Sequence, residues 1–176
     1  MQTGIRQKVA LLNQSMDLHI NKDTQLCMSL AGRPGNFGTR FHNFLYCQLG
    51  LNFIYKAFTT RDIGSAIAGI RALGIRGCAI SMPFKETCIE YLDELDASAK
   101  GIMSVNTIVS TDGYLKAYNT DYAAVSELIR LATSLGKKTI TGAEVIVLQA
   151  IEQFVLYTGV RPDAEQIEKA AAFARS

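Results

Sequence analysis

Several features that often reveal a function are scarce or missing in this 176-residue sequence. It has no tryptophan, and its four cysteines form neither a C-x-x-C pair nor a group with either of the two histidines. The cysteines are therefore expected to be reduced thiols, and no metal site is indicated. No apolar run approaches the about 18 residues of a membrane span. Residues 1–20 lack the apolar run and cleavage site of a signal peptide, so the sequence predicts a cytoplasmic protein.

An excess of charge of one sign is also missing. The 18 basic and 16 acidic residues leave a net charge of +2, and only Lys137 and Lys138 are adjacent basic residues. This balance gives no electrostatic reason to expect a nucleic acid or a membrane surface as a partner. With 48% hydrophobic and 19% charged residues, the composition is that of a globular domain with a substantial core.

Strand-like and helix-like segments alternate along the chain. This order predicts an open, mostly parallel α/β sheet covered on both faces, a three-layer α/β/α fold with C-terminal helices packed on it. A turn at 111–113 predicts a hairpin that adds an antiparallel edge. The helix at 142–157 is apolar nearly all round and is expected to be buried. Strands are predicted at 25–30, 53–59, 77–81, 104–110 and 114–118, and helices at 39–49, 63–73, 85–92, 120–135, 142–157 and 163–175.

Three compact polar groups lie at the ends of predicted strands: Ser81 to Lys85, Asn106-Thr107, and Asn119 to Asp121. Ligands of open α/β sheets bind beyond the carboxyl ends of the strands, so these groups predict one polar pocket with a lysine and a carboxylate in it. A lysine beside a carboxylate can exchange a proton with a substrate hydroxyl. Two alternatives stay open: Lys85 as an ordinary solvated residue, and Asp121 as a first-turn charge favoured by the helix dipole.

Three further features have more than one interpretation. The loop 32–38 has the spacing G-x-x-G-x-x-G rather than G-x-G-x-x-G, and Pro34 removes a backbone donor, so a turn that holds a small ligand is favoured over a nucleotide site. His42 is expected to be a structural residue at the opening of its helix. Gln149, a polar side chain in an apolar helix, either bonds a neighbouring backbone group or points into the pocket.

Taken together, these motifs resemble those of the shikimate dehydrogenase family, from about Gln25 to the C-terminus. The resemblance implies an enzyme that interconverts 3-dehydroshikimate and shikimate with NADPH. It further implies that Lys85 and Asp121 are the catalytic pair, that Asn106, Asp121 and Gln149 hold the ring hydroxyls, and that Ser81 lines the pocket. The matching motifs are Ser-Met-Pro-Phe-Lys at 81–85, Val-Asn-Thr at 105–107, Asn-Thr-Asp at 119–121, Gln-Ala at 149–150 and Thr-Gly-Val-Arg-Pro at 158–162.

The sequence departs from the family pattern in two places. The serines that bind the substrate carboxylate in the family are replaced by Asn36 and Gly38, and an amide can donate to a carboxylate whereas glycine has no side chain to do so. The family's NADP-binding Rossmann domain has no room here, because only residues 130–141 join the helices that flank it, and a single βαβ unit takes about 30 residues.

The expected organisation is therefore an N-terminal extension, 1–20, followed by one substrate-binding domain, 21–176, made of an α/β part (21–129) and returning helices (130–176). NADP belongs to the full-length family, and no cofactor is expected to bind this chain. The expected partner is a shikimate-like small molecule, and a homodimer stays open. The chain alone is expected to lack turnover. The alternative is a stand-alone binding or regulatory module for a shikimate- or quinate-like hydroxylated carboxylate.

Overall fold

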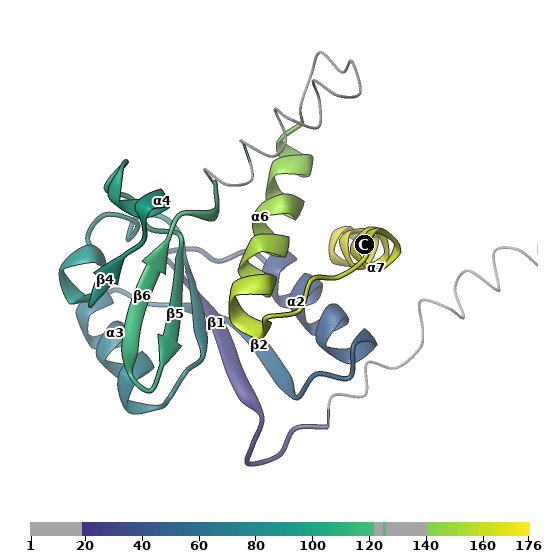
Figure 1. Cartoon of the computed structure of the whole chain (residues 1–176), viewed down its shortest axis with the longest axis horizontal. Coiled ribbons are helices and arrows are strands. Elements are labelled where there is room, and N and C mark those ends of the chain that lie inside the picture. The colour runs from purple at the N-terminus through teal and green to yellow at the C-terminus, as the bar shows by residue number, and fades with distance from the viewer. Residues whose placement is uncertain (1–18, 122–124, 126–140) are drawn as a thin grey trace, which may run out of the picture.

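A six-stranded sheet forms the middle layer of the molecule. The computed structural model describes residues 19–121, 125 and 141–176 (Figure 1). The strand order is β2-β1-β3-β5-β6-β4, and β5 alone runs antiparallel to its neighbours. The predicted mostly parallel α/β sheet is thereby confirmed. The strands are β1 (Gln25–Ala31), β2 (Phe53–Thr59), β3 (Gly77–Ile80), β4 (Glu94–Leu95), β5 (Thr107–Thr111) and β6 (Tyr114–Tyr118).

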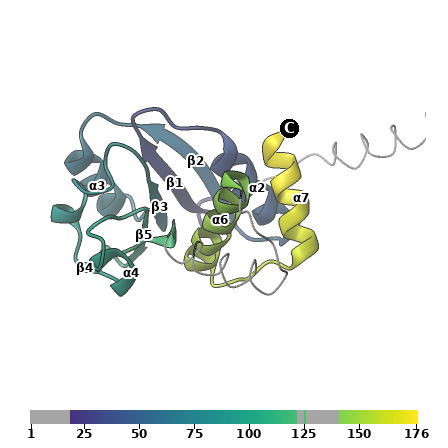
Figure 2. The ribbon, with the colours of Figure 1, turned by 90° about the horizontal axis from the view of Figure 1, so that it is seen from above.

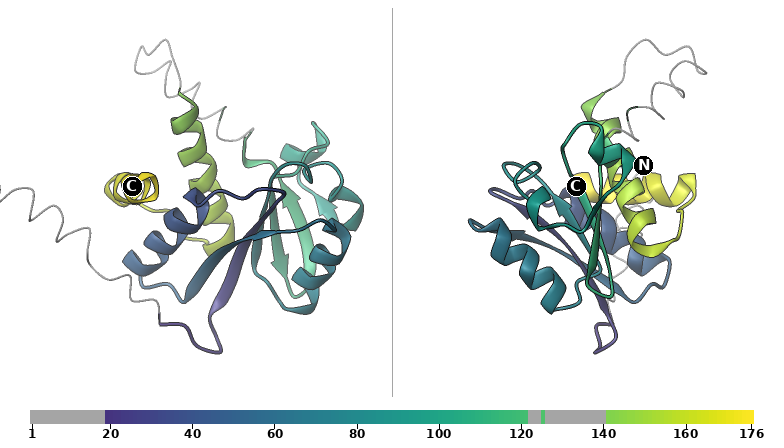
Figure 3. Two further views of the ribbon diagram at one scale, coloured as in Figure 1. Left: turned by 180° about the vertical axis from the view of Figure 1, so that it is seen from behind. Right: turned by 60° about the vertical axis from the view of Figure 1, so that its left-hand side comes forward.

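Helices cover both faces of the sheet, as Figures 2 and 3 show. One buried apolar cluster joins α3 and α4 to one face, and a second joins α2, α6 and α7 to the other. Successive residues of β1 alternate between the clusters: Cys27 belongs to the second and Met28 to the first. The helices are α2 (Phe37–Gln48), α3 (Ile63–Ala72), α4 (Ala97–Lys100), α6 (Gly142–Thr158) and α7 (Ala164–Arg175), with a short 3₁₀ turn, η1 (Ile89–Tyr91).

Local capping signals set most helix boundaries. The side chain of Asp62 accepts a hydrogen bond from the Ser65 amide at the start of α3. Full capping boxes, in which the N-cap side chain and a side chain three residues on bond each other's backbone, open α6 at Thr141 and α7 at Asp163. Gly159 ends α6 in the left-handed region, with φ 73°. These boundaries follow the sequence prediction to within two residues.

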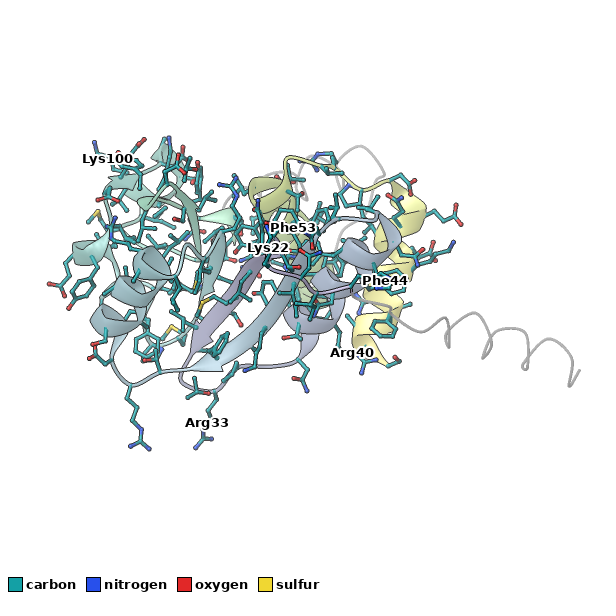
Figure 4. All side chains as sticks on the ribbon, turned by 90° about the horizontal axis from the view of Figure 1, so that it is seen from below. Lys22, Arg33, Arg40, Phe44, Phe53 and Lys100 are labelled. Carbon is teal, nitrogen blue, oxygen red and sulfur yellow. The ribbon has the colours of Figure 1, made fainter. Side chains whose placement is uncertain are left out.

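The last helix, α7, is bonded to α2. The Arg40 guanidinium donates to the Phe173 carbonyl from Nη2 at 2.8 Å and also lies over the Phe173 ring. The Phe44 ring packs against the same phenylalanine, with centroids 5.3 Å apart. Figure 4 shows Arg40 and Phe44 extending from α2 towards α7. The chain after residue 141 thus returns to the N-terminal part of the domain.

Two predicted features within residues 19–118 are wrong. No helix forms over 85–92, where only η1 is present, because the Lys85 carbonyl accepts from the Val105 amide at 2.8 Å instead of from the next helical turn. The hairpin of β5 and β6 does not form the outermost part of the sheet. The outermost strand is β4, a strand of two residues that pairs in parallel with β6. The predicted helix 120–135 lies outside the described residues, apart from Thr120, Asp121 and Val125.

The prediction that α6 is buried holds only for its second half. Ala150, Ile151, Phe154 and Tyr157 are buried there, whereas Ile146 in the first half is 48% exposed. In Figure 1 the first turns of α6 extend beyond the neighbouring α2. Within residues 19–121 and 141–176, no helix is both long and apolar enough to cross a lipid bilayer. The same residues contain no cluster of metal-ligating side chains, and all four cysteines are free thiols.

Candidate active site

Strand direction brings the three polar groups to one edge of the sheet. β3 and β6 end at this edge, and β5 begins there because it runs antiparallel to both. Asn106 links the three strands, since its carbonyl accepts from the Ile80 amide at 2.8 Å and its amide donates to the Tyr118 carbonyl at 3.1 Å. The structure brings the three polar groups together, although Asn106 precedes its strand and the other groups follow theirs.

Lys85 and Asp121 form an ion pair across this edge. Lys85 Nζ lies 2.7 Å from Asp121 Oδ2, and the two side chains are 25% and 33% exposed. The pair is therefore sheltered but open to a ligand. An ammonium group held by a carboxylate can give a proton to a substrate oxygen and take it back. Of the alternatives for these residues, an unpaired, fully solvated Lys85 does not describe the structure.

The side chain of Asn106 is held in one orientation. Its Oδ1 accepts from the Thr120 backbone amide at 2.8 Å, from Thr107 Oγ1 at 2.8 Å and from Thr120 Oγ1 at 3.1 Å. Its Nδ2 is buried and has no hydrogen-bond partner within the described residues. A buried unsatisfied donor costs about 1–3 kcal/mol, so this amide is suited to receive an oxygen of a ligand.

The neighbouring Asn119 has a structural role that the sequence did not reveal. Its Nδ2 donates to the Ser104 carbonyl at 2.9 Å, and its backbone amide donates to Ser98 Oγ at 3.1 Å. These bonds attach the end of β6 to α4 and to the segment that follows α4. Asn119 thereby fixes the backbone from which Asp121 extends.

Helix α6 brings a glutamine to the site, and it is not the expected one. Gln153 Nε2 donates to Thr107 Oγ1 at 3.2 Å and lies 3.4 Å from the Asn106 carbonyl oxygen. Gln149 lies one turn earlier on the same helical face, half-buried and with no hydrogen bond among the described residues. The signal that could have indicated Gln153 is a second glutamine, four residues after the first, in a largely apolar helix.

The remaining predicted residues lie at the same edge without joining the hydrogen-bonded group. Ser81 directly follows β3, is exposed, and its side chain makes no hydrogen bond within the described residues. Asn36 is exposed and is the N-cap of α2, but its side chain makes no capping bond. A β-carbon added at Gly38 would meet the Tyr55 ring at 3.5 Å, an ordinary contact distance. Arg33 of this loop points into solvent (Figure 4).

Cavities of about 370 Å³ and 610 Å³ lie away from this site. The larger is lined by residues at the starts of β1 and β2 and by the turn between β5 and β6, which is the opposite edge of the sheet. The smaller lies beside the end of α2 and the start of β2. Neither cavity contains a predicted site residue, so the site rests on the polar group itself.

His42 is a core residue in the interior of α2, whereas the sequence predicted a structural residue at the opening of the helix. Its side chain is fully buried and stacks on Tyr55, with ring centroids 4.5 Å apart. Burial lowers the pKa of His42 to about 3, and a contact with Gln153 opposes this shift. His42 is therefore neutral near pH 7, and a structural role is supported.

Known proteins share both the sequence and the fold of this chain. The family description "Shikimate dehydrogenase substrate binding domain" matches residues 37–108. A shikimate dehydrogenase-like protein of Haemophilus influenzae is 41% identical over 268 aligned positions, which cover 89% of this chain and 99% of the relative. The NADP⁺ shikimate dehydrogenase of Pyrococcus abyssi is 38% identical over 123 residues. This match covers 69% of the present chain but only 45% of that protein.

A solved structure leads to the same family. The structure of a shikimate 5-dehydrogenase-like protein superposes with a TM-score of 0.84 at 41% identity, covering 89% of this chain and 100% of that one. The motifs at the sheet edge, the matched family description and this relative agree, so the chain belongs to the shikimate dehydrogenase family.

Proposed function

We propose that this chain is the substrate-binding part of a shikimate dehydrogenase-like oxidoreductase. The observation that carries the proposal is the Lys85–Asp121 ion pair of 2.7 Å at the sheet edge that also holds Asn106. The substrate is a shikimate-like hydroxylated carboxylate of aromatic amino acid biosynthesis. Lys85 exchanges the proton of the reacting hydroxyl, and Asp121, 2.7 Å away, holds the ammonium group in place.

The other polar side chains hold the substrate. Asn106 Nδ2 is buried and has no partner within the described residues, and it donates to a ring hydroxyl. Gln149, which lies on α6, binds a second ring hydroxyl. Ser81 lines the pocket, and Asn36 donates to the substrate carboxylate. The family resemblance gives these roles to their positions, and the shared sheet edge is consistent with them.

The loop after β1 is poorly suited to hold the phosphates of a dinucleotide. In the loop after β1, the Gly32 amide donates to the Met82 carbonyl at 3.0 Å, and Pro34 has no amide hydrogen. A phosphate cradle needs such amides free. The alignment with the Haemophilus influenzae relative also has more positions than this chain has residues, so part of that relative has no counterpart here. The proposal is that NADP serves the full-length family and that this chain binds none.

The same observation favours a second candidate function. A chain with the polar site but without a dinucleotide loop would act as a binding or regulatory module for a shikimate- or quinate-like carboxylate. The two functions differ in whether a dehydrogenase partner supplies the hydride site. A cytoplasmic location belongs to both, and a homodimer is compatible with both.

Removal of the Asp121 carboxylate is expected to weaken ligand binding tenfold or more. A hydrogen bond to a charged group contributes about 1.5–3 kcal/mol, and each 1.4 kcal/mol is a factor of ten. Calorimetric titration of wild type and Asp121→Ala with shikimate and with quinate measures this loss. Asp23→Ala, an exposed carboxylate paired with Lys22 near the start of β1, is the matched control and should bind as wild type does.

Two results would contradict the proposal. One is a wild-type chain that takes up neither ligand, and the other is an unchanged affinity in Asp121→Ala. The purified chain should not oxidise NADPH in the presence of 3-dehydroshikimate. Robust turnover would show that the cofactor part of the proposal is wrong.

Restoring the two serines of the family loop is expected to raise the affinity for shikimate about tenfold. Gly38→Ser adds a hydroxyl donor to the substrate carboxylate, whereas Asn36→Ser exchanges one donor for another, and one hydrogen bond to a charged group contributes about 1.5–3 kcal/mol. The variant Asn36→Ser/Gly38→Ser is sterically possible, because the nearest atoms to a β-carbon at Gly38 are 3.5 Å away. Gly35→Ser is the control, since a β-carbon there meets nothing within 4 Å. Equal affinities of the double variant and the wild type would contradict a carboxylate subsite in this loop.

A further inference from the structure

Gln153 connects the C-terminal helix to the start of β5. Its Nε2 approaches two acceptors, Thr107 Oγ1 at 3.2 Å and the Asn106 carbonyl oxygen at 3.4 Å. A primary amide has two N–H donors, so this group can donate to both. These hydrogen bonds tie α6 to Asn106, the residue that carries the unpartnered donor of the site.

The Thr107 hydroxyl links Gln153 to the Asn106 side chain by hydrogen bonds. Thr107 is fully buried, and its hydroxyl has a single proton. Because Thr107 Oγ1 accepts from Gln153, that proton is directed to Asn106 Oδ1, 2.8 Å away, and not to Thr120 Oγ1, 3.4 Å away. Gln153 therefore sets the direction of the Thr107 hydroxyl.

The result is an amide with a defined orientation. Asn106 Oδ1 accepts from Thr107 Oγ1 and also from the backbone and hydroxyl of Thr120. With the oxygen fully engaged by the protein, Nδ2 is the end left for a ligand, and it is buried without a partner within the described residues. Without the Gln153 donor, the Thr107 hydroxyl could turn to Thr120, and one of the three bonds that fix the amide would be lost.

We propose that Gln153 is a positioning residue of the site, which orients the Asn106 amide through the Thr107 hydroxyl. Its hydrogen bonds also fix the position of α6, and with it Gln149, relative to Asn106. The identity of the ligand that Asn106 binds rests on the proposed function. The orientation of the amide is a property of the chain itself and can be measured without a ligand.

The first experiment uses the ligand-free protein. In ¹H–¹⁵N spectra, the side-chain amide signals of Asn106 are identified by their loss in Asn106→Asp. They are expected to shift or broaden in Gln153→Glu, where a carboxylate of nearly the same shape accepts from Thr107 instead of donating to it. They are also expected to change in Gln153→Leu. Gln48→Glu, the same substitution at an exposed position of α2, should leave them in place.

The second experiment is a titration of wild type and Gln153→Leu with shikimate. A three- to tenfold weaker affinity is expected, because the Asn106 amide is held less firmly. Leucine is chosen because it adds no charge that could repel the ligand. Unchanged Asn106 amide signals in both Gln153 variants would overturn the inference, whatever the titration gives. A wild-type chain that binds no shikimate would overturn the proposed function, while the spectra would still decide the role of Gln153.

Discussion

Replacement of His42 by phenylalanine is expected to remove most of the pH dependence of stability between pH 6.5 and 4.5. His42 is fully buried, and neither ring nitrogen has a hydrogen bond of good geometry within the described residues. Burial lowers its pKa to about 3, and the weaker influence of Gln153 acts in the opposite direction. The rings around it belong to Phe41, Tyr46, Tyr55, Phe154 and Tyr157.

The sign follows from the two states of the histidine. In the unfolded chain the imidazole takes up a proton near pH 6.5, whereas in the folded protein it stays neutral down to about pH 3. Acid therefore favours the unfolded chain: the contribution is fully present above pH 6.5 and is lost as the pH falls towards 3. The slope approaches about 1.4 kcal/mol per pH unit, so about 2–3 kcal/mol is lost by pH 4.5.

Urea unfolding at pH 7.5, 6.5, 5.5 and 4.5, followed by circular dichroism, measures this slope. His42→Phe keeps a flat ring stacked on Tyr55 and has nothing to protonate, so its free energy of unfolding should be nearly constant over this range. Asp93 and Asp96 also have lowered pKa values, but their contributions to stability are lost mainly as the pH falls below this window. His19→Gln, at an exposed position, is the control. A slope that persists in His42→Phe would contradict the assignment.

Local sequence signals were sufficient to predict most helices and strands. The helix predicted over 163–175 is present, and a capping box of Asp163 and Gln166 opens it. β2 and β6 have the predicted bounds, because β-branched and aromatic residues are bounded there by turn signals. The ion pair of Lys85 and Asp121 followed from their positions after parallel strands, which share one sheet edge.

Features that depend on tertiary contacts could not be predicted in this way. The segment after Lys85 has helical spacing, but Val105, distant in sequence, takes the carbonyl that a helix would use. The contact of Gln153 with Thr107 exists because α6 docks beside the start of β5, and no local pattern gives that distance. The role of Gln149 as a ligand-binding residue remains a prediction.

The packing of α6 depends on a glycine, and Gly77→Ala is expected to destabilise the fold by about 3 kcal/mol, near the upper end of the range for overpacked cores. A β-carbon at Gly77, the first residue of β3, would overlap Cδ1 and Cε1 of the Tyr157 ring. The ring cannot move away easily, because Tyr157 is 1% exposed and packs against His42. The backbone is also held, since Arg76 Nε donates to the Tyr157 carbonyl at 3.0 Å.

Chemical denaturation of Gly77→Ala and Gly69→Ala separates the packing clash from the general effect of replacing glycine. Gly69 lies within α3, and a β-carbon there meets nothing within 4 Å, so alanine should stabilise that helix by about 0.5–1 kcal/mol. Gly77→Ala should lose stability instead, and Tyr157→Leu in the same chain should recover part of the loss, because the two substitutions are in contact. A Gly77→Ala protein as stable as the wild type would contradict the close packing of α6 on β3. Since Gln153 lies one turn before Tyr157, a helix displaced by this clash should also lose the hydrogen bond to Thr107, and shikimate binding should weaken together with stability.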